Sequence, residues 1–395
     1  MHFPFTFSGM YRKISLDRRN ESTMQTMMTY FATAAFGLEG VVAAELKRLG
    51  MKDVRGEMGG ARFTATVEEA FLCNLRLRSA DRVLMVLGEQ ECRSFEELFQ
   101  FVKTIPWETL LTKDGKYHVS GKCVRSQLMS IRDCQAITKK AIIERMRTHS
   151  GKDVFPETGA VHPIEVALHT DVARLTLDLS GDALNRRGYR TWNGEAPLRE
   201  TLAATLVELS PWRPGMRLHD PCCGTGTLLI EAAFRQGHRA PGLTRKFAME
   251  DYCFFPKEAC EAIRRQCRFD FEPERISGIS GSDIDANALD LAGRHVRQAG
   301  LEGKIELTQT PLEQLTLPDE QGVFLCNPPY GERLSDRKTC QKLYREMGRL
   351  KARHPGWSLC AITSDPGFER AFGRRADKKR RLYNGRLECE FLIYK

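Results

Sequence analysis

The sequence predicts an α/β protein with two or more folding units, of which the second is a parallel sheet covered by helices on both faces. Its 395 residues are about twice the length of a typical domain. In the second half, apolar strand candidates alternate with helical segments, which is typical of a parallel sheet. The first half mixes strands and helices and ends in a hairpin candidate. We place the boundary near Arg186, in a stretch that is rich in Arg and Gly and shows neither the apolar periodicity of a helix nor that of a strand.

The first unit is predicted from apolar periodicity and from helix start and stop signals. Its first helix is stopped by Gly50, and another begins with Ser94 followed by Glu97, the pattern of a capping box. The hairpin turns around Asp171. The expected strands cover 29–35, 82–90, 116–124, 164–170 and 172–181, and the expected helices cover 38–50, 94–105 and 134–147.

In the second unit, each buried strand candidate is followed by a helical segment. The strand candidates are 216–220, 276–283, 322–326 and 358–365, and the helical ones are 228–236, 286–300 and 340–353. Residues 386–395 form one more strand candidate, which would end the sheet with an antiparallel edge. No internal repeat or low-complexity tract is found.

Composition excludes a membrane span and favours a polyanionic partner. No apolar run approaches the length needed to cross a bilayer. The net charge of +9 points weakly toward a polyanion. Thirteen cysteines without a secretion signal indicate reduced thiols in the cytoplasm. Residues 1–28 have neither an apolar signal core nor the composition of a transit peptide, so we expect a disordered extension there.

The cysteines do not indicate a metal site. Cys222 is adjacent to Cys223, and Cys253, Cys260 and Cys267 are seven residues apart, so neither group has the C-x2-C spacing of common metal sites. Spacing by seven is what a buried helical stripe produces. We therefore expect core packing and no bound metal.

A glycine turn follows the first strand of the second unit. DPCCGTGT places Asp220 at the end of a strand, and Gly224 and Gly226 in a tight turn that opens a helix. The third glycine of a dinucleotide fingerprint is absent, because Leu229 occupies that position. NAD is therefore disfavoured, although a lone G-x-G would equally suit a structural turn.

A second strand end presents Asp283, whose carboxylate can accept both hydroxyl protons of a ribose. Alternatively, Asp283 could cap the following helix, with Asp285 as the competing cap. Asp283 lies 57 positions after Gly226 (283 − 226), whereas a dinucleotide fold places its acid about 20 residues on. Residues 234–277 must therefore hold an insertion, whose role the sequence does not indicate.

The third strand end carries Asn327, Pro328, Pro329 and Tyr330. Prolines lack a backbone N–H, so carbonyls there are free to face a ligand. The Asn327 amide oxygen and the Pro328 carbonyl can accept hydrogen bonds from a planar amine, and Tyr330 can stack on the attached ring. Neutral acceptors make such a nitrogen nucleophilic without an acid or a metal. A Pro-Pro loop that merely ends a strand is the structural alternative.

In combination these motifs resemble a known family. FATAAFGLEGVVAAEL, DCQAITKKAI, RGYR, APLRETLAA, DPCCGTGT, SDID, NPPYGERL and KKRRLYNG are similar to the THUMP-domain class I methyltransferases, and most to the bacterial 23S rRNA guanine-N2 enzymes. The resemblance implies a ferredoxin-like plus THUMP region over 29–185 and a Rossmann-like catalytic domain over 186–395.

By the same resemblance, the cofactor is S-adenosylmethionine and the substrate is the N2 amine of a guanine in structured RNA, either 23S rRNA or a ribosome assembly intermediate. The implied catalytic residues are Asn327, Pro328, Pro329 and Tyr330. The implied cofactor-binding residues are Pro197, Leu198, Asp220, Pro221, Gly224, Thr225, Gly226, Asp283 and Ile284.

Two groups of basic residues are candidate RNA contacts. The segment from Arg370 to Arg386 holds eight Lys or Arg against one acid, with Phe372 and Tyr383 interleaved, although a solvated charged face would look the same. The first group is Lys122, Arg125, Lys139 and Lys140, and the second is Arg374, Arg375, Lys378, Lys379, Arg380 and Arg381.

Four functions remain to be compared. Methylation of a protein or of DNA fits poorly with a THUMP-like first half, and RNA binding without catalysis fits poorly with an intact glycine turn and N-P-P-Y loop. Methylation of a guanine N2 in tRNA by a THUMP relative is the serious competitor of the rRNA reading. The sequence does not name the nucleotide, because base identity is read by pocket shape and RNA fold.

Overall fold

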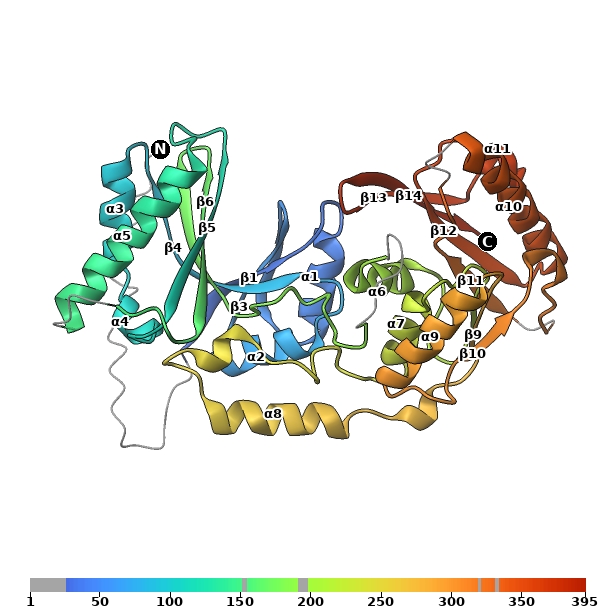
Figure 1. The fold of residues 1–395 in the computed structure, drawn as a ribbon, viewed down its shortest axis with the longest axis horizontal. Helices are drawn as coiled ribbons and strands as arrows, with labels where there is room; N and C mark the ends of the chain where they lie inside the picture. The colour runs from blue at the N-terminus through green and yellow to red at the C-terminus, as the bar shows by residue number, and fades with distance from the viewer. Residues whose placement is uncertain (1–25, 151–154, 191–197, 319–320, 331–333) are drawn as a thin grey trace.

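The protein contains two seven-stranded sheets at opposite ends of an elongated molecule (Figure 1). The computed structural model describes residues 26–150, 155–190, 198–318, 321–330 and 334–395. Residues 1–25 of the expected N-terminal extension lie outside the described residues, whereas Met28 pairs with Ala65 in the first sheet. The fold consists of a first unit that mixes helices and strands, followed by a second unit with a largely parallel sheet, as the sequence predicts.

The first sheet has the strand order β2-β3-β1-β4-β7-β6-β5. All neighbours are antiparallel except β5 and β6. The expected hairpin forms between β6 and β7, with Asp171 at the turn in the left-handed region (φ 62°). The strands are β1 (Met28–Thr33), β2 (Lys52–Glu57), β3 (Gly60–Ala65), β4 (Arg82–Glu91), β5 (Lys116–Val124), β6 (Val161–His169) and β7 (Val172–Asp178).

Helices cover the first sheet. Capping boxes start α2 at Thr66 with Glu69, and α3 at Ser94 with Glu97, because each hydroxyl and carboxylate satisfies a free backbone N–H. The helices are α1 (Glu39–Arg48), α2 (Val67–Arg76), α3 (Phe95–Thr104), α4 (Trp107–Leu110) and α5 (Ile131–Ser150). In the part of the chain that the structure describes, no helix combines the length and apolarity that crossing a bilayer requires.

The second sheet has the order β10-β9-β8-β11-β12-β14-β13. The first five strands are parallel, and β14 is antiparallel to both of its neighbours. The expectation that residues 386–395 form the edge was wrong: β14 lies between β12 and β13, and the basic strand β13 is the edge. The strands are β8 (Arg217–Asp220), β9 (Ile279–Asp283), β10 (Glu306–Gln309), β11 (Gly322–Cys326), β12 (Trp357–Thr363), β13 (Lys378–Asn384) and β14 (Leu387–Tyr394).

Helices pack on both faces of the second sheet and enclose two apolar clusters. One cluster contains Leu229 of α7 and Val296 of α9, and the other contains Tyr344 of α10 and Phe368 of α11. The central strand β11 is buried over its whole length between them. The helices are α6 (Glu200–Leu209), α7 (Thr227–Gln236), α9 (Ala286–Gln298), α10 (Leu334–Arg353) and α11 (Phe368–Phe372).

The insertion between α7 and β9 packs against the first unit. It contains α8 (Lys257–Phe269), which lies beneath both units in Figure 1 and contacts α2. Phe247, Cys260 and Cys267 are buried in the apolar cluster of the first unit. The predicted stripe of three cysteines is therefore wrong for Cys253, which is exposed and precedes the helix.

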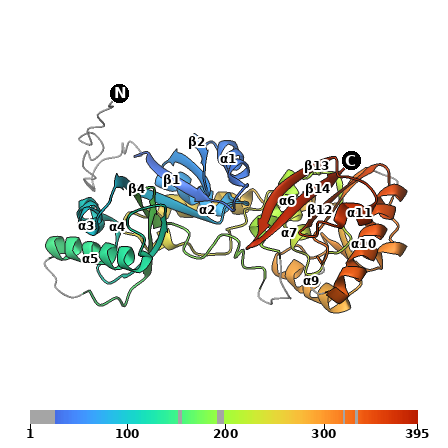
Figure 2. The same ribbon diagram turned by 90° about the horizontal axis from the view of Figure 1, so that it is seen from above.

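The two units are also joined by buried charges. The Arg187 guanidinium lies 3.4 Å from Oε1 of Glu231 on α7, and both side chains are almost fully buried. Arg187 also donates to the carbonyls of Leu184 (2.7 Å) and Arg78 (2.5 Å), and the latter follows α2. At the other end, Arg380 of β13 donates to the Gly37 carbonyl (2.7 Å), where Figure 2 shows the β13–β14 hairpin approaching the first unit.

Candidate active site

Three parallel strands bring the predicted motifs to one edge of the second sheet. β8 lies between β9 and β11, and its register pairs Asp220 with Gly281 and His219 with Phe324. Asp283 and Asn327 therefore each lie about two residues beyond the level of Asp220. Because neighbouring strands are roughly 4.8 Å apart, the backbones at these two positions are separated by about 10 Å. A single ligand can contact all three strand ends.

The glycine turn leaves open space beside its backbone. Gly224 (φ 49°) and Gly226 (φ 78°) are both in the left-handed region, which favours glycine. A Cβ added to Gly226 would lie 3.3 Å from Ala292 of α9, whereas no atom lies within 4 Å of the place a Cβ of Gly224 would take. Gly226 is thus favoured by its left-handed φ and by the tight contact with Ala292, while Gly224 leaves room for a ligand against the turn.

Asp283 fixes this turn, and Asp285 caps the next helix. Oδ2 of Asp283 accepts the Gly224 N–H (2.9 Å), and its Oδ1 accepts the Asp285 N–H (3.1 Å). The Asp285 carboxylate accepts the Asn287 N–H (2.9 Å) at the start of α9. Asp285 is therefore the cap, and the alternative role of Asp283 as the cap is excluded. Each Asp283 oxygen retains a lone pair for a ligand hydroxyl.

The floor of the site is formed by buried side chains whose burial disfavours the charged form. Asp220 accepts the Cys222 N–H (3.0 Å), and burial, together with nearby Asp283, raises the pKa of its carboxyl well above the usual range. Burial also raises the pKa of Cys222 and Cys223, so both thiols stay protonated and unreactive. His219 bridges the hydroxyls of two β9 serines, and burial lowers its pKa to about 4.

In the N-P-P-Y loop, the predicted acceptor is already engaged. The Tyr330 hydroxyl donates to Oδ1 of Asn327, and the Tyr330 ring packs against the core of the second unit. Burial raises the pKa of this hydroxyl, which keeps it a donor. An amide oxygen accepts two hydrogen bonds, so Asn327 can take an incoming N–H beside Tyr330 or after its release.

Several residues that sequence reasoning missed hold the site in place. Arg190 donates to the Leu198 carbonyl (2.8 Å) and to the Thr227 hydroxyl (3.1 Å), and lies 3.5 Å from Glu200. It thereby ties the segment before α6 to the start of α7. Tyr344 of α10 donates to the Pro329 carbonyl (2.7 Å). Arg190 is the second arginine of the RGYR motif, but the motif alone does not indicate which residues Arg190 contacts.

The remaining predicted cofactor residues are distributed around the same edge. Leu198 and Pro221 are buried, whereas Ile284 is 72% exposed beside Asp283 and offers an apolar surface at the rim. Thr225 lies in the glycine turn, where its carbonyl contacts His295 (3.1 Å). Pro197 lies outside the described residues.

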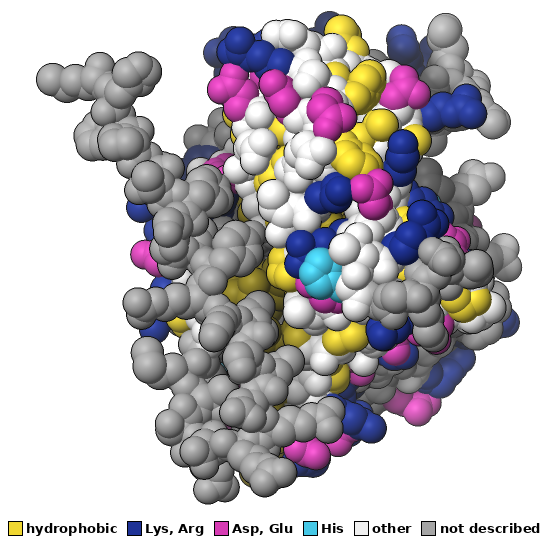
Figure 3. Space-filling view, turned by 90° about the vertical axis from the view of Figure 1, so that its left-hand side faces the viewer, with side chains coloured by type: hydrophobic (Ala, Val, Ile, Leu, Met, Phe, Trp, Pro, Cys, Tyr) yellow, Lys and Arg dark blue, Asp and Glu magenta, His cyan; other side chains and the backbone are white. Residues whose placement is uncertain are grey.

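The first group of RNA candidates is partly neutralised. Lys122 pairs with Glu165 (2.8 Å), Lys139 pairs with Glu157 (2.6 Å), and Lys140 lies 5.7 Å from the Phe99 ring centre. Arg125 is exposed, with a φ of 50°. Figure 3 shows the end of the molecule that carries the first unit, where basic and acidic side chains are interspersed. Among the side chains coloured in that view, no patch of a single sign is seen.

The second group lies along β13 and the turn before it. Lys379 pairs with Glu369, Arg381 with Glu388 (3.1 Å) and Arg374 with Asp377 (2.8 Å). Arg375 and Lys378 are exposed. The edge strand is therefore still basic. The unpaired positive charge of the group is smaller than its composition indicates, because three of its basic residues are paired with carboxylates.

The two aromatic residues of this segment have different surroundings. Phe372 is not a stacking platform, because it is buried against Tyr394 with ring centres 4.0 Å apart. Tyr383 instead meets the exposed Phe36 of the first unit edge to face (5.8 Å). Only Tyr383 therefore remains a candidate for contact with a base.

No cluster of three or more His, Cys, Asp or Glu side chains that could hold a metal is found in the described ranges. The open space at Gly224, the acceptor at Asp283 and the apolar Ile284 suit a ligand with a ribose and an apolar ring. The groups at Asn327 suit a neutral amine. The arrangement therefore fits the transfer of a small group from the ribose-containing ligand to the amine.

The strand order and these three strand ends define a class I methyltransferase. The chain belongs to the RMKL-like methyltransferase family, whose domain matches residues 187–393. An RlmL ferredoxin-like domain matches residues 29–84, and a THUMP domain matches residues 92–178. The predicted family and fold class are confirmed.

Two relatives of known sequence align along nearly the whole chain. YpsC of Bacillus subtilis strain 168, named as a candidate RNA methyltransferase, is 39% identical over 93% of this chain and 95% of its own length. The ribosomal RNA large subunit methyltransferase K/L of Syntrophotalea carbinolica is 35% identical over 94% of this chain and 54% of its own length. This chain thus spans about half the length of that relative.

Two crystal structures share the whole fold. That of a predicted N6-adenine-specific DNA methylase from Listeria monocytogenes str. 4b F2365 is 40% identical, covers 94% of this chain and 96% of its own, and has a TM-score of 0.89. That of SMU.472, a candidate methyltransferase complexed with SAH, is 39% identical, covers 94% and 98%, and has a TM-score of 0.88.

Proposed function

We propose that this protein transfers a methyl group from S-adenosylmethionine to the exocyclic N2 amine of a guanine in 23S rRNA. The observation that carries the proposal is the convergence of Gly224, Asp283 and Asn327 on three adjacent strand ends. The THUMP domain and the RNA methyltransferase names of the relatives support an RNA substrate. The partner would be 23S rRNA or a ribosome assembly intermediate in the cytoplasm.

The cofactor supplies a methyl group on a positively charged sulfur. The complex of SMU.472 with SAH supports its use here, and the free space at Gly224 fits its methionine part. Asp283 would accept the ribose hydroxyls, Asp220 and Pro221 would form the floor, and Ile284 would pack against the adenine. Leu198 would close the site from the side, held by Arg190.

The N-P-P-Y loop would prepare the amine. Oδ1 of Asn327 and the Pro328 carbonyl would each accept one N–H, which turns the nitrogen lone pair out of conjugation with the ring. The cofactor would supply the methyl group, whose C–S bond would break as the N–C bond forms, and the amine would release one proton to the solvent. Holding nitrogen and methyl in line supplies proximity, and a stacked Tyr330 would contribute about 1–3 kcal/mol.

If Asp283 binds the ribose, its replacement should weaken the binding of SAH by a predictable factor. Asp283→Ala removes two charge-assisted hydrogen bonds to the ribose, each of about 1.5–3 kcal/mol, so SAH affinity should fall by about a hundredfold or more. Asp285→Ala is the matched control, because it removes only a helix cap worth about 1 kcal/mol of stability. Calorimetric titration with SAH compares the two. Equal affinities in both variants would refute the assigned role.

The substrate is tested by mass spectrometry of nucleosides from a strain that lacks the gene. We expect one N2-methylguanosine to disappear from 23S rRNA and to return on complementation. Unchanged rRNA with altered tRNA would favour the guanine-N2 methyltransferases of tRNA instead. Loss of N6-methyladenine from DNA would favour the DNA activity named for the Listeria structure.

A further inference from the structure

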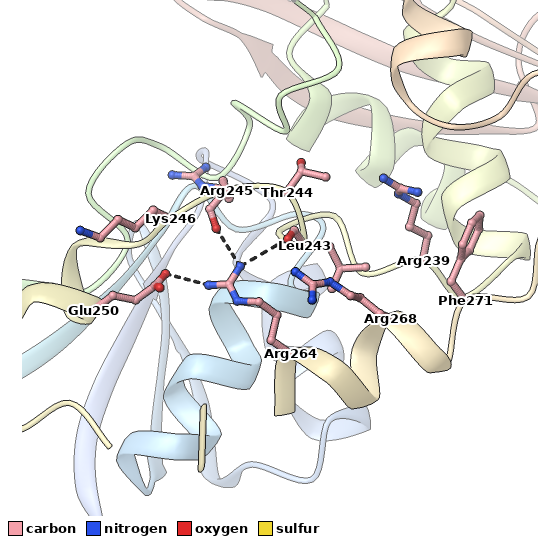
Figure 4. A pocket seen from close by; sticks show the side chains of 9 residues that line it. All are labelled: Arg239, Leu243, Thr244, Arg245, Lys246, Glu250, Arg264, Arg268 and Phe271. Atoms are coloured by element: carbon pink, nitrogen blue, oxygen red, sulfur yellow. Dashed lines mark hydrogen bonds and ion pairs between the residues drawn. The ribbon is translucent and has the colours of Figure 1, made fainter. Parts of the chain in front are cut away.

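The insertion forms a basic pocket away from the three strand ends. The pocket has a volume of about 700 Å³ and lies beyond the C-terminal end of α7. Because α7 begins at the glycine turn and is ten residues long, the two sites are separated by about 15 Å of helix. The pocket is lined by Arg239, Leu243, Thr244, Arg245, Lys246, Glu250, Arg264, Arg268 and Phe271 (Figure 4).

The lining carries five cations and one carboxylate. Glu250 is paired with Arg264 (2.7 Å), and Lys246 is paired with Asp251 (2.6 Å), which does not line the pocket. Among the described residues, none of the other three arginines forms an ion pair with a carboxylate. The pocket lining therefore carries more positive than negative charge within the described ranges, although Asp182 and Asp178 lie close enough to Arg245 to offset part of it.

Arg239 is the most unusual of these cations. Its guanidinium lies between the rings of Phe234 and Phe271, 5.0 and 5.2 Å from their centres, and Figure 4 shows it beside Phe271. Its side chain has no hydrogen-bond acceptor in the described part of the chain, and burial lowers its pKa. Arg239 is only partly buried, and none of its guanidinium nitrogens is a fully buried orphan, so these N–H groups remain accessible to an anionic ligand in the pocket.

Two other arginines link the segments of the pocket rim through hydrogen bonds. Arg264 of α8 donates to the carbonyls of Arg245 (2.8 Å) and Leu243 (3.3 Å) as well as to Glu250. Arg245 donates to the Ala183 carbonyl (2.7 Å) at the junction of the two units. These bonds are drawn for Arg264 in Figure 4. The exposed Arg268, one turn further along α8, is free to contact a ligand.

We propose that this pocket binds phosphate groups of the RNA backbone, with Arg239 and Arg268 as the contacting side chains. Pockets for small ligands are lined mainly by apolar residues with a few polar groups, whereas more than half of this lining is cationic. Arginine forks match phosphate geometry, and backbone contacts position a nucleic acid without reading its sequence. The inference rests on the proposed RNA substrate and gives the insertion the role of a second RNA anchor.

The test compares Arg268→Ala and Arg239→Gln with Arg265→Ala. Arg265 lies on the same helix, is exposed and does not line the pocket, so its replacement removes the same charge. Binding of deproteinised 23S rRNA is measured over a series of salt concentrations, and inorganic pyrophosphate is titrated by calorimetry. Arg268→Ala removes only an exposed side chain and keeps the test valid if Arg239→Gln folds poorly.

Both pocket variants should raise the Kd for rRNA several-fold more than Arg265→Ala does. Each should also reduce the slope of log K against log salt by about 0.7 to 0.9. The proposal would be overturned if all three variants had the same Kd for rRNA and the same salt slope. It would also be overturned if the pocket bound pyrophosphate tightly while its variants kept wild-type rRNA affinity. SAH affinity and single-turnover methylation at saturating rRNA should stay unchanged. If the wild-type protein methylates no RNA, the proposed function fails, and the binding comparison still decides the pocket.

Discussion

Asn327→Ala should lower kcat for methyl transfer by about 10²- to 10³-fold or more while leaving SAH affinity within about twofold of wild type. The expected loss follows because preorganised hydrogen-bond partners at the reacting group contribute factors of this size. Asn327 contacts the amine and not the cofactor in the proposed arrangement. Single-turnover assays with radiolabelled methyl donor measure the first quantity, and calorimetry measures the second.

Tyr330→Phe is the matched control on the same loop. It removes the hydroxyl that donates to Oδ1 of Asn327 but keeps the ring for stacking. We expect a small change in kcat, because the freed oxygen can still accept the amine. Full activity of Asn327→Ala, or equal losses in both variants, would contradict the proposed role of the amide oxygen.

Arg187→Ala should lower the free energy of unfolding by about 3 to 5 kcal/mol. Removing one partner of a buried ion pair is strongly destabilising, because Glu231 then stays buried with only the Tyr189 hydroxyl (3.0 Å) and the nearby Arg78 charge to offset its burial. The variant also loses the hydrogen bonds that link Arg187 to the backbone carbonyls after α2. Denaturant unfolding of the full chain, followed by circular dichroism and tryptophan fluorescence, gives the change.

The neighbouring Arg186 provides the control. Its ion pair with Asp182 is exposed on both sides, so Arg186→Ala should change stability by no more than about 0.5 kcal/mol. If both substitutions lowered the free energy of unfolding by a similar, small amount, the interface between the units would not depend on the buried ion pair. A loss confined to one of two separate transitions would identify the unit that Arg187 stabilises.

The sequence predicted the parts of this fold that depend on local pattern. Buried strands such as β11 and amphipathic helices such as α9 were predicted in place, and the three motifs fell at strand ends because parallel strands present their carboxyl ends at one edge. The ribose role of Asp283 and the amine role of Asn327 remain predictions.

Other elements gave no clear local signal. α6 is buried on nearly every side, so it lacks the polar face that marks a surface helix. β10 has only four residues, and β13 reads as a charged run because it is an exposed edge strand. The insertion of β14 between β12 and β13 depends on long-range pairing. The packing of the α8 insertion on the first unit likewise depends on contacts far apart in sequence.

A crystal structure of this protein with SAH would show whether the three strand ends form one site. We predict that the ribose hydroxyls lie on Asp283, that the methionine part lies against Gly224, and that the sulfur faces the side-chain oxygen of Asn327. A ligand bound elsewhere, or an Asn327 side chain directed away from the sulfur, would contradict this prediction.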